Sequence, residues 1–130
     1  MDDLESVQAL APDLEKIKRF EEELRITGIA VFTLKTVSNE VSAHLRFFAP
    51  SIGITENAAA GSAAGGLGAY LALTKGLPES KLLDFSIEQG LELGRPSRLY
   101  VSVQSRNGYT KLVKVGGYST TLLRGTLKLP

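Results

Sequence analysis

The spacing of apolar residues predicts helices at the start of the chain. In one stretch they recur at helical intervals between charged residues, at Leu14, Ile17, Phe20 and Leu24. Pro12 separates this stretch from an earlier helical one, because the residue before a proline avoids the helical region. We expect Pro12 to occupy the first turn of the second helix and Gly28 to end it.

Strand patterns account for most of the remaining chain. Residues 29–37 are β-branched and aromatic, and residues 41–50 alternate between apolar and polar side chains. Four further strands are expected at 82–90, 97–105, 110–117 and 118–129. Asn107-Gly108 predicts a hairpin between the second and third of these, and Gly116-Gly117 predicts another before the last.

Residues 62–74, with the sequence SAAGGLGAYLALT, are apolar on every side and predict a buried helix. Gly65, Gly66 and Gly68 would each weaken an exposed helix by roughly 1 kcal/mol relative to alanine. We therefore expect these glycines to let strands pack close to the helix axis, with Tyr70 in the core. The pattern as a whole predicts an α+β fold with two N-terminal helices, one central helix and about six strands.

Composition narrows the class of protein. The chain has 130 residues, enough for one domain, and a net charge of +1 without a basic stripe that is interleaved with aromatics. There is no cysteine, and the only histidine, His44, cannot build a metal site alone, so we expect it to be structural or solvent-facing. The acidic start does not suit a signal peptide, and no apolar run suits a membrane span. We expect a soluble cytoplasmic protein that binds neither nucleic acid nor membrane.

The stretch ENAAAGSAAGGLGAYL, residues 56–71, is the strongest candidate for chemistry. A helix N-terminus presents unpaired N–H groups and a partial positive charge, which can hold a carboxylate or phosphate when no side chain blocks it. Gly61 and the alanines at 58–60 leave that space, and Ser62 adds a hydroxyl. The alternative is a tightly packed helix start with Ser62 as an ordinary cap. The stretch is neither a Walker A loop nor a dinucleotide fingerprint.

Three motifs in order resemble the PhzF-like isomerases, a family named for phenazine biosynthesis. RFFAPSIGITENAAAGSAAGGLGAYL resembles the family's Arg-x-Phe, Pro-x-x-Gly-Ile-x-Glu-Asp-Pro-Ala-Thr-Gly-Ser-Ala signature and the helix after it. EQGLELGRPSRLYVSV resembles its Gln-Gly-x-x-x-Gly-Arg-Pro-Ser stretch, and VKVGGYSTTLLRGTLKL resembles its closing Val-x-Val-Gly-Gly and strand. The resemblance covers essentially all of residues 1–130, which we interpret as the family's C-terminal half.

The resemblance implies a diaminopimelate-epimerase-like domain, a barrel-like sheet wrapped around a central helix. It also implies an active site between two such domains, in which an acidic residue moves a proton at carbon without a metal or a cofactor. Carried over to this chain, the substrate-binding residues are Asn57, Gly61, Ser62 and Ala63.

This chain departs from the family pattern in two ways. The domain that carries the family's catalytic glutamate is absent, and Asn57 stands where the family has an aspartate. Because an amide cannot titrate, Asn57 is not expected to act as a general acid or base. Arg46 could clamp a carboxylate, although an ion pair with Glu56 is favoured, and Glu88 is a further titratable candidate that is more simply a solvated strand-end residue.

These observations leave three hypotheses. The chain could be half of a split isomerase that a separately encoded domain completes. It could instead be a homodimer that binds a small anionic metabolite without catalysis, or a structural remnant without a ligand. We favour the first, and we predict a dimer, homomeric or heteromeric, because a lone half would expose an apolar face.

Overall fold

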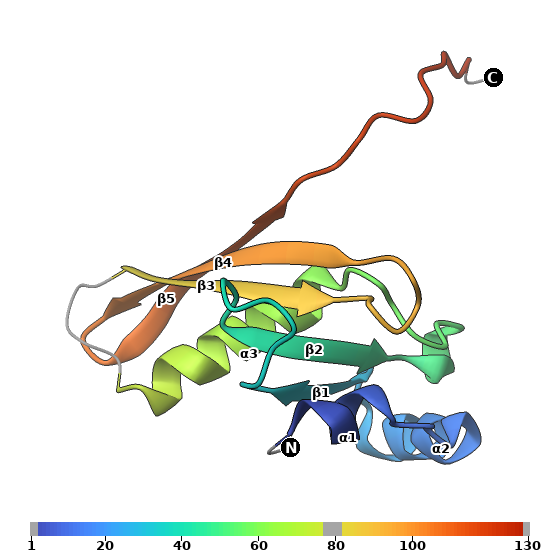
Figure 1. Cartoon of the computed structure of the whole chain (residues 1–130), viewed down its shortest axis with the longest axis horizontal. Coiled ribbons are helices and arrows are strands. Elements are labelled where there is room, and N and C mark those ends of the chain that lie inside the picture. The colour runs from blue at the N-terminus through green and yellow to red at the C-terminus, as the bar shows by residue number, and fades with distance from the viewer. Residues whose placement is uncertain (1–2, 77–81, 129–130) are drawn as a thin grey trace.

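A computed structural model describes residues 3–76 and 82–128 of the chain (Figure 1). The helical elements are α1 (Leu4–Gln8), α2 (Leu14–Leu24), the short 3₁₀ helix η1 (Pro50–Ile52) and α3 (Gly61–Thr74). The strands are β1 (Ile29–Thr33), β2 (Ala43–Phe48), β3 (Leu82–Gln89), β4 (Ser97–Arg106) and β5 (Tyr109–Gly117). The chain thus has the mixed α and β content that the sequence predicts.

The strands form one sheet in the order β1-β2-β3-β4-β5. All neighbouring pairs are antiparallel except β2 and β3, which are parallel. A parallel pair needs a long crossover connection, and α3 provides it. The start of α3 therefore lies near the ends of β2 and β3, the arrangement on which the candidate site is built.

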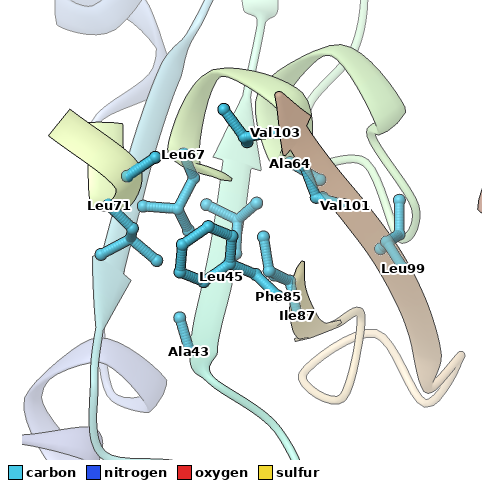
Figure 2. Packing of buried hydrophobic residues seen from close by; sticks show 11 residues of the cluster. Ala43, Leu45, Ala64, Leu67, Leu71, Phe85, Ile87, Leu99, Val101 and Val103 are labelled. Carbon is cyan, nitrogen blue, oxygen red and sulfur yellow. The ribbon is translucent and has the colours of Figure 1, made fainter. Parts of the chain in front are cut away.

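Helix α3 packs against one face of the sheet, and the two share the hydrophobic core (Figure 2). The sheet is open, so the expectation of a sheet wrapped around the helix is not met in the described residues. The core is made by side chains from α3 and from β2, β3 and β4, namely Ala43, Leu45, Ala64, Leu67, Leu71, Ala72, Phe85, Ile87, Leu99, Val101 and Val103.

The glycines of α3 have different surroundings. A Cβ atom on Gly68 would lie 2.4 Å from Cγ1 of Val101, and one on Gly65 would lie 3.1 Å from Cγ2 of Val115. These two positions confirm that small residues admit the strands close to the helix. Gly66 faces open space, with nothing within 4 Å. Tyr70 is 53% exposed and packs edge-on against Phe32, so its expected place in the core is wrong.

The N-terminal helices begin at aspartates that cap them. Asp3 accepts a hydrogen bond from the Ser6 amide, and Asp13 accepts one from the Lys16 amide. Pro12 therefore lies outside α2, one residue before its cap, and not in its first turn. The apolar stripe of α2 is only partly covered, since Phe20 is 48% exposed and Leu24 is 52% exposed.

The C-terminal end of the fold differs most from expectation. Asn107 and Gly108 have φ of 53° and 76° and join β4 to β5, which confirms the first hairpin. Gly116 and Gly117 lie within β5 and make no turn, so residues 118–128 form no strand and the described sheet has five strands, not six. Glycine pairs permit a turn but do not impose one, and here both glycines are paired with β4, Gly116 with Tyr100 and Gly117 with Leu99. In Figure 1 this segment runs away from the sheet.

Two strand predictions were too long, and the strand expected over residues 41–50 covers only Ala43–Phe48. The first strand ends at Thr33 and not at Val37. The backbone amide of Val37 donates a hydrogen bond to the side-chain carboxylate of Glu88 and not to the backbone of a neighbouring strand. Of the helices in the described ranges, none is both long and apolar enough to cross a membrane.

Candidate functional site at the start of helix α3

Helix α3 begins without a side-chain cap. Its N-cap residue is Ala60, which has no side-chain oxygen, and in the described part of the chain no side chain caps it. Ser62 lies inside the first turn and is exposed, so its expected role as the cap is wrong. The first backbone amide to donate a helical hydrogen bond is that of Ala64, to the carbonyl oxygen of Ala60 at 2.9 Å. The preceding amides, of Gly61, Ser62 and Ala63, keep the partial positive charge of the helix start.

The helix start opens onto a hollow of about 490 Å³. Its lining comes from the loop before α3, the start of β4 and the end of β5: Ala59, Gly61, Pro96, Ser97, Arg98, Leu99, Val115, Gly116, Gly117 and Tyr118. A Cβ atom on Gly61 would come within 3.8 Å of Val115, an ordinary contact, so packing alone does not require glycine there. Gly61 is the residue of α3 that borders the hollow.

Asn57 holds the loop that leads into α3. Its side-chain oxygen accepts a hydrogen bond from the Ala59 amide at 2.9 Å, and its backbone amide donates to the Phe47 carbonyl at 3.0 Å. The side-chain oxygen of Asn57 is thus engaged in a local turn of its own loop. Like Ser62 and Ala63, Asn57 is close in sequence to the hollow, but none of the three lines it.

Gln89 is a buried residue that the sequence analysis did not single out as part of the site. Its side-chain oxygen accepts from the Ala60 amide at 3.2 Å, and its side-chain nitrogen donates to the Asn57 carbonyl. The side chain is fully buried at the end of β3. A glutamine in a buried strand is an unusual choice, and that signal could have marked it.

Gly90 lets the same loop approach β3. It has φ of +79°, and a Cβ atom there would lie 2.4 Å from the Arg95 carbonyl oxygen and 2.7 Å from that of Ala58. Glycine is therefore required both by the backbone conformation and by the lack of space. Gln89 and Gly90 together fix the loop from which α3 starts.

Arg46 and Glu56 form a two-contact ion pair beside this loop, as the sequence analysis favoured. Nε and Nη2 of Arg46 each lie 2.8 Å from a carboxylate oxygen of Glu56. Nη1 of Arg46 also donates to the backbone carbonyls of residues 7, 8 and 10, which ties α1 to the sheet. The hydrogen bonds that Arg46 donates to Glu56 raise the pKa of Arg46 above its ordinary value. Both side chains are mostly buried and committed to each other, so neither is free to bind substrate.

His44 is fully buried between two carboxylates. Its Nδ1 lies 3.0 Å from Oε1 of Glu88, and its Nε2 lies 2.8 Å from Oε1 of Glu92. Glu88 is 5% exposed, and its carboxylate also accepts hydrogen bonds from the backbone amides of Val37 and Ser38. The expectation of a solvated strand-end residue is therefore wrong. The cluster joins β2 and β3 to the loop after β1, and none of its members lines the hollow.

The start of α3 presents backbone amides without a helical partner, but the hollow beside it offers no group that could carry a proton to or from carbon. Among the described residues that line the hollow there is no aspartate, glutamate or histidine. Arg98 donates hydrogen bonds to Glu40 and Ser38, and the bond to Glu40 raises the pKa of Arg98 above its ordinary value. No group of three or more metal-ligating side chains occurs in the described ranges.

Comparison with known proteins identifies the family. The model of the phenazine biosynthesis-like protein family matches residues 1–125. An uncharacterized isomerase of Clostridium acetobutylicum is 28% identical over 97% of this chain and 42% of its own length. The trans-2,3-dihydro-3-hydroxyanthranilate isomerase of Pseudomonas aeruginosa is 38% identical over 62% of this chain and 28% of its own length.

The fold agrees with these matches. A crystal structure of a PhzF-family phenazine biosynthesis protein from Bacillus anthracis superposes with a TM-score of 0.68. It is 24% identical, and the match covers 88% of this chain and 42% of that one. The chain spans less than half of the length of these relatives. Sequence and fold together show that this chain belongs to the phenazine biosynthesis-like protein family.

Proposed function

We propose that this chain supplies the anion-binding half of a PhzF-type isomerase and that a second domain supplies the proton-transfer residue. The observation that carries the proposal is the uncapped start of α3, which borders a hollow whose described lining residues include no acidic side chain. The helix start would hold the carboxylate of a small acid. The relatives that are named as isomerases support the reaction class.

The need for a partner has separate support. The chain corresponds to 42% of the Clostridium relative, so a complete counterpart would contain more than twice its length. Residues 118–128 carry large apolar side chains that are almost fully exposed, with Leu122 at 93% and Leu123 at 90%. Apolar surface of this extent commonly marks an interaction site.

A tryptophan at position 62 tests the anion site. Ser62→Trp places a bulky side chain at the mouth of α3, so we expect it to abolish binding of inorganic phosphate and small carboxylates while the domain stays folded. Binding is measured by NMR titration of the amides of residues 61–63. The control is Leu73→Trp, at the exposed far end of the same helix, which should bind as the wild type does. Unchanged binding by Ser62→Trp would contradict the site.

Isotope exchange tests the division of labour. The chain alone, incubated in deuterated buffer with trans-2,3-dihydro-3-hydroxyanthranilate, is expected to exchange no carbon-bound proton, because no acid lines the hollow. Exchange above the buffer rate would show that an acid in this half does the chemistry and would refute the split-site proposal.

A further inference from the structure

His44 contacts two carboxylates at once through its two ring nitrogens. Nδ1 lies 3.0 Å from Glu88 and Nε2 lies 2.8 Å from Glu92, and the imidazole ring has no exposure to water. Each of these contacts needs a proton between nitrogen and oxygen, whereas a neutral imidazole carries only one N–H. When the cluster loses one proton, a nitrogen lone pair therefore faces a carboxylate oxygen, and that contact becomes repulsive.

The two carboxylates are held unequally. Glu88 also accepts hydrogen bonds from the backbone amides of Val37 and Ser38, at 2.6 and 3.1 Å, which keep it in place without His44. Glu92 lacks such support, because its buried Oε2 has no hydrogen-bond partner in the described part of the chain. A buried carboxylate oxygen without a partner is costly, and the cost is relieved when the side chain turns out to water. Glu92 is therefore the member that leaves when a proton is lost.

Arg46 does not replace the lost proton. It lies two residues along β2 from His44 and forms its two-contact ion pair with Glu56. The hydrogen bonds to Glu56, and beyond them the charge of Glu92, raise the pKa of Arg46. Because this attraction is mutual, it favours the ionised form of Glu92 over the protonated one. The proton in the contact between Glu92 and His44 is thus supplied by the imidazole ring.

The remaining ionisable groups around the cluster are directed elsewhere. Strand β1, which pairs with β2, has no charged residue, and Glu5 of α1 is exposed. In the loop after β1, Lys35 is exposed and Glu40 pairs with Arg98 at 3.0 Å. Among the described residues, the ring of His44 is hydrogen-bonded to the two carboxylates and to no other side chain.

Glu92 lies in the loop between β3 and β4, residues 90–96, which we call the β3–β4 loop. The loop is a compact turn in which the Arg95 amide donates to the Gly90 carbonyl at 2.9 Å. At one end Gly90 is in close contact with the loop before α3, and at the other end Pro96 lines the hollow. Release of Glu92 therefore loosens a turn that borders the candidate site.

We infer that Glu92 is a positioning residue whose hydrogen bond from protonated His44 holds the β3–β4 loop in place, and that loss of one proton from the cluster releases the loop. The loop is closed while the cluster keeps both protons, and it opens as the pH rises through the titration of His44. That the loop also controls anion binding rests on the proposed function, whereas the response of the loop to a proton does not.

The first measurement follows the β3–β4 loop of the full chain without any ligand. His44 is the only histidine, so NMR of its ring protons gives its titration directly between about pH 5 and about pH 9. We expect the hydrogen-exchange protection factors of the Leu93, Gly94 and Arg95 amides, which donate within the turn, to fall at least about tenfold over that titration. Unchanged protection over this range, whether or not the ring titrates, would overturn the inference.

Two substitutions of Glu92 separate the proton from the packing. The amide of Glu92→Gln can accept a hydrogen bond from the protonated ring and donate one to the neutral ring, so we expect this variant to keep the loop protected at every pH. Glu92→Ala removes the contact, and its loop should be open at every pH. The matched control Glu22→Gln, at an exposed position of α2, should follow the wild type. A pH-dependent loop in Glu92→Gln, or a protected one in Glu92→Ala, would contradict the role of Glu92.

A titration with sulfate connects the loop to the anion site. Sulfate keeps its charge over this pH range, and the described lining of the hollow contains no aspartate, glutamate or histidine. We expect the sulfate affinity of the wild type to fall at least about threefold as the loop opens, and that of Glu92→Gln to stay constant. Equal pH dependence in both would show that the loop does not control the site. If sulfate does not bind at all, the proposed function fails, while the ligand-free measurement still decides the inference about the loop.

Discussion

Helix α2 begins at an aspartate that caps it, whereas α3 begins at an alanine that cannot. In α2, Asp13 accepts the Lys16 amide and also pairs with the Lys16 ammonium at 2.9 Å, and both residues are exposed. In α3 the first amides stay open, and the helix is held by the core and by the loop seated on Gln89 and Gly90. The start of α2 is specified by a residue that is close in sequence. The start of α3 is specified by residues that are close only in space. That difference leaves the start of α3 available to a ligand.

The largest effect is expected where the loop before α3 meets β3. Gly90→Ala should destabilise the fold by about 3 kcal/mol, because a Cβ atom would meet two backbone carbonyl oxygens and the positive φ adds strain. Urea unfolding gives the free energy of unfolding. The control is Gly53→Ala, where φ is +81° but nothing lies within 4 Å, so only the strain of ~1–2 kcal/mol is expected. Equal losses at both positions would show that the loop is not seated on Gly90.

The next largest loss of stability is expected from a substitution inside α3. Gly68→Ala should lower the free energy of unfolding by ~1–3 kcal/mol, because the new methyl group would lie 2.4 Å from Val101 in a packed core. Thermal and urea unfolding measure it. We also expect the double variant Gly68→Ala, Val101→Ala to lose less stability than the sum of the losses in the two single variants. Such a difference would confirm that the two residues are in contact. Strict additivity would contradict the close approach.

A smaller loss is expected at the cap of α2. Asp13→Ala should lower the melting temperature by a few degrees, since it removes the bond to the Lys16 amide. Hydrogen bonds from Lys16 hold the pKa of Asp13 below its ordinary value. The contribution of the cap is therefore present above the unfolded-state pKa and is lost as the pH falls through the folded-state one. Melting curves of wild type and variant should converge in acid; a constant difference would argue against the ionised cap.

The smallest effect has the opposite sign. Gly66→Ala should raise the free energy of unfolding by ~0.5–1 kcal/mol, because the position is helical and exposed and has nothing within 4 Å. The same unfolding measurements used for Gly68→Ala apply. If both substitutions changed stability in the same direction, the distinction between the two faces of α3 would be lost.

The sequence predicted much of the architecture from local patterns. The central helix, the split N-terminal helices and the Asn107-Gly108 hairpin are visible in residue spacing and turn chemistry, and the structure confirms them. The family was also evident from ordered motifs, and the match over residues 1–125 confirms it. The fate of residues 118–128 could not be predicted, because their apolar pattern is that of a strand but pairing depends on a neighbour.

Site residues were predicted unevenly for a related reason. The preference for an Arg46–Glu56 pair is confirmed, and it could be predicted because the two residues are only 10 positions apart in sequence. Glu92 had no local signal of its role, and Gln89 had only that of a polar residue in a buried strand, since their partners are 48 and 29 or more residues away in sequence. The anion role of Asn57, Gly61, Ser62 and Ala63 stays a prediction.

What the sequence determined by itself is the set of elements and the small residues at the start of α3, since spacing, caps and turn residues act over a few positions. Tertiary structure decided which glycines of α3 meet a strand, which charged groups are buried in pairs and which apolar residues are left uncovered. These outcomes depend on contacts between residues that are distant along the chain, and only the packing of the helix on the sheet brings those residues together.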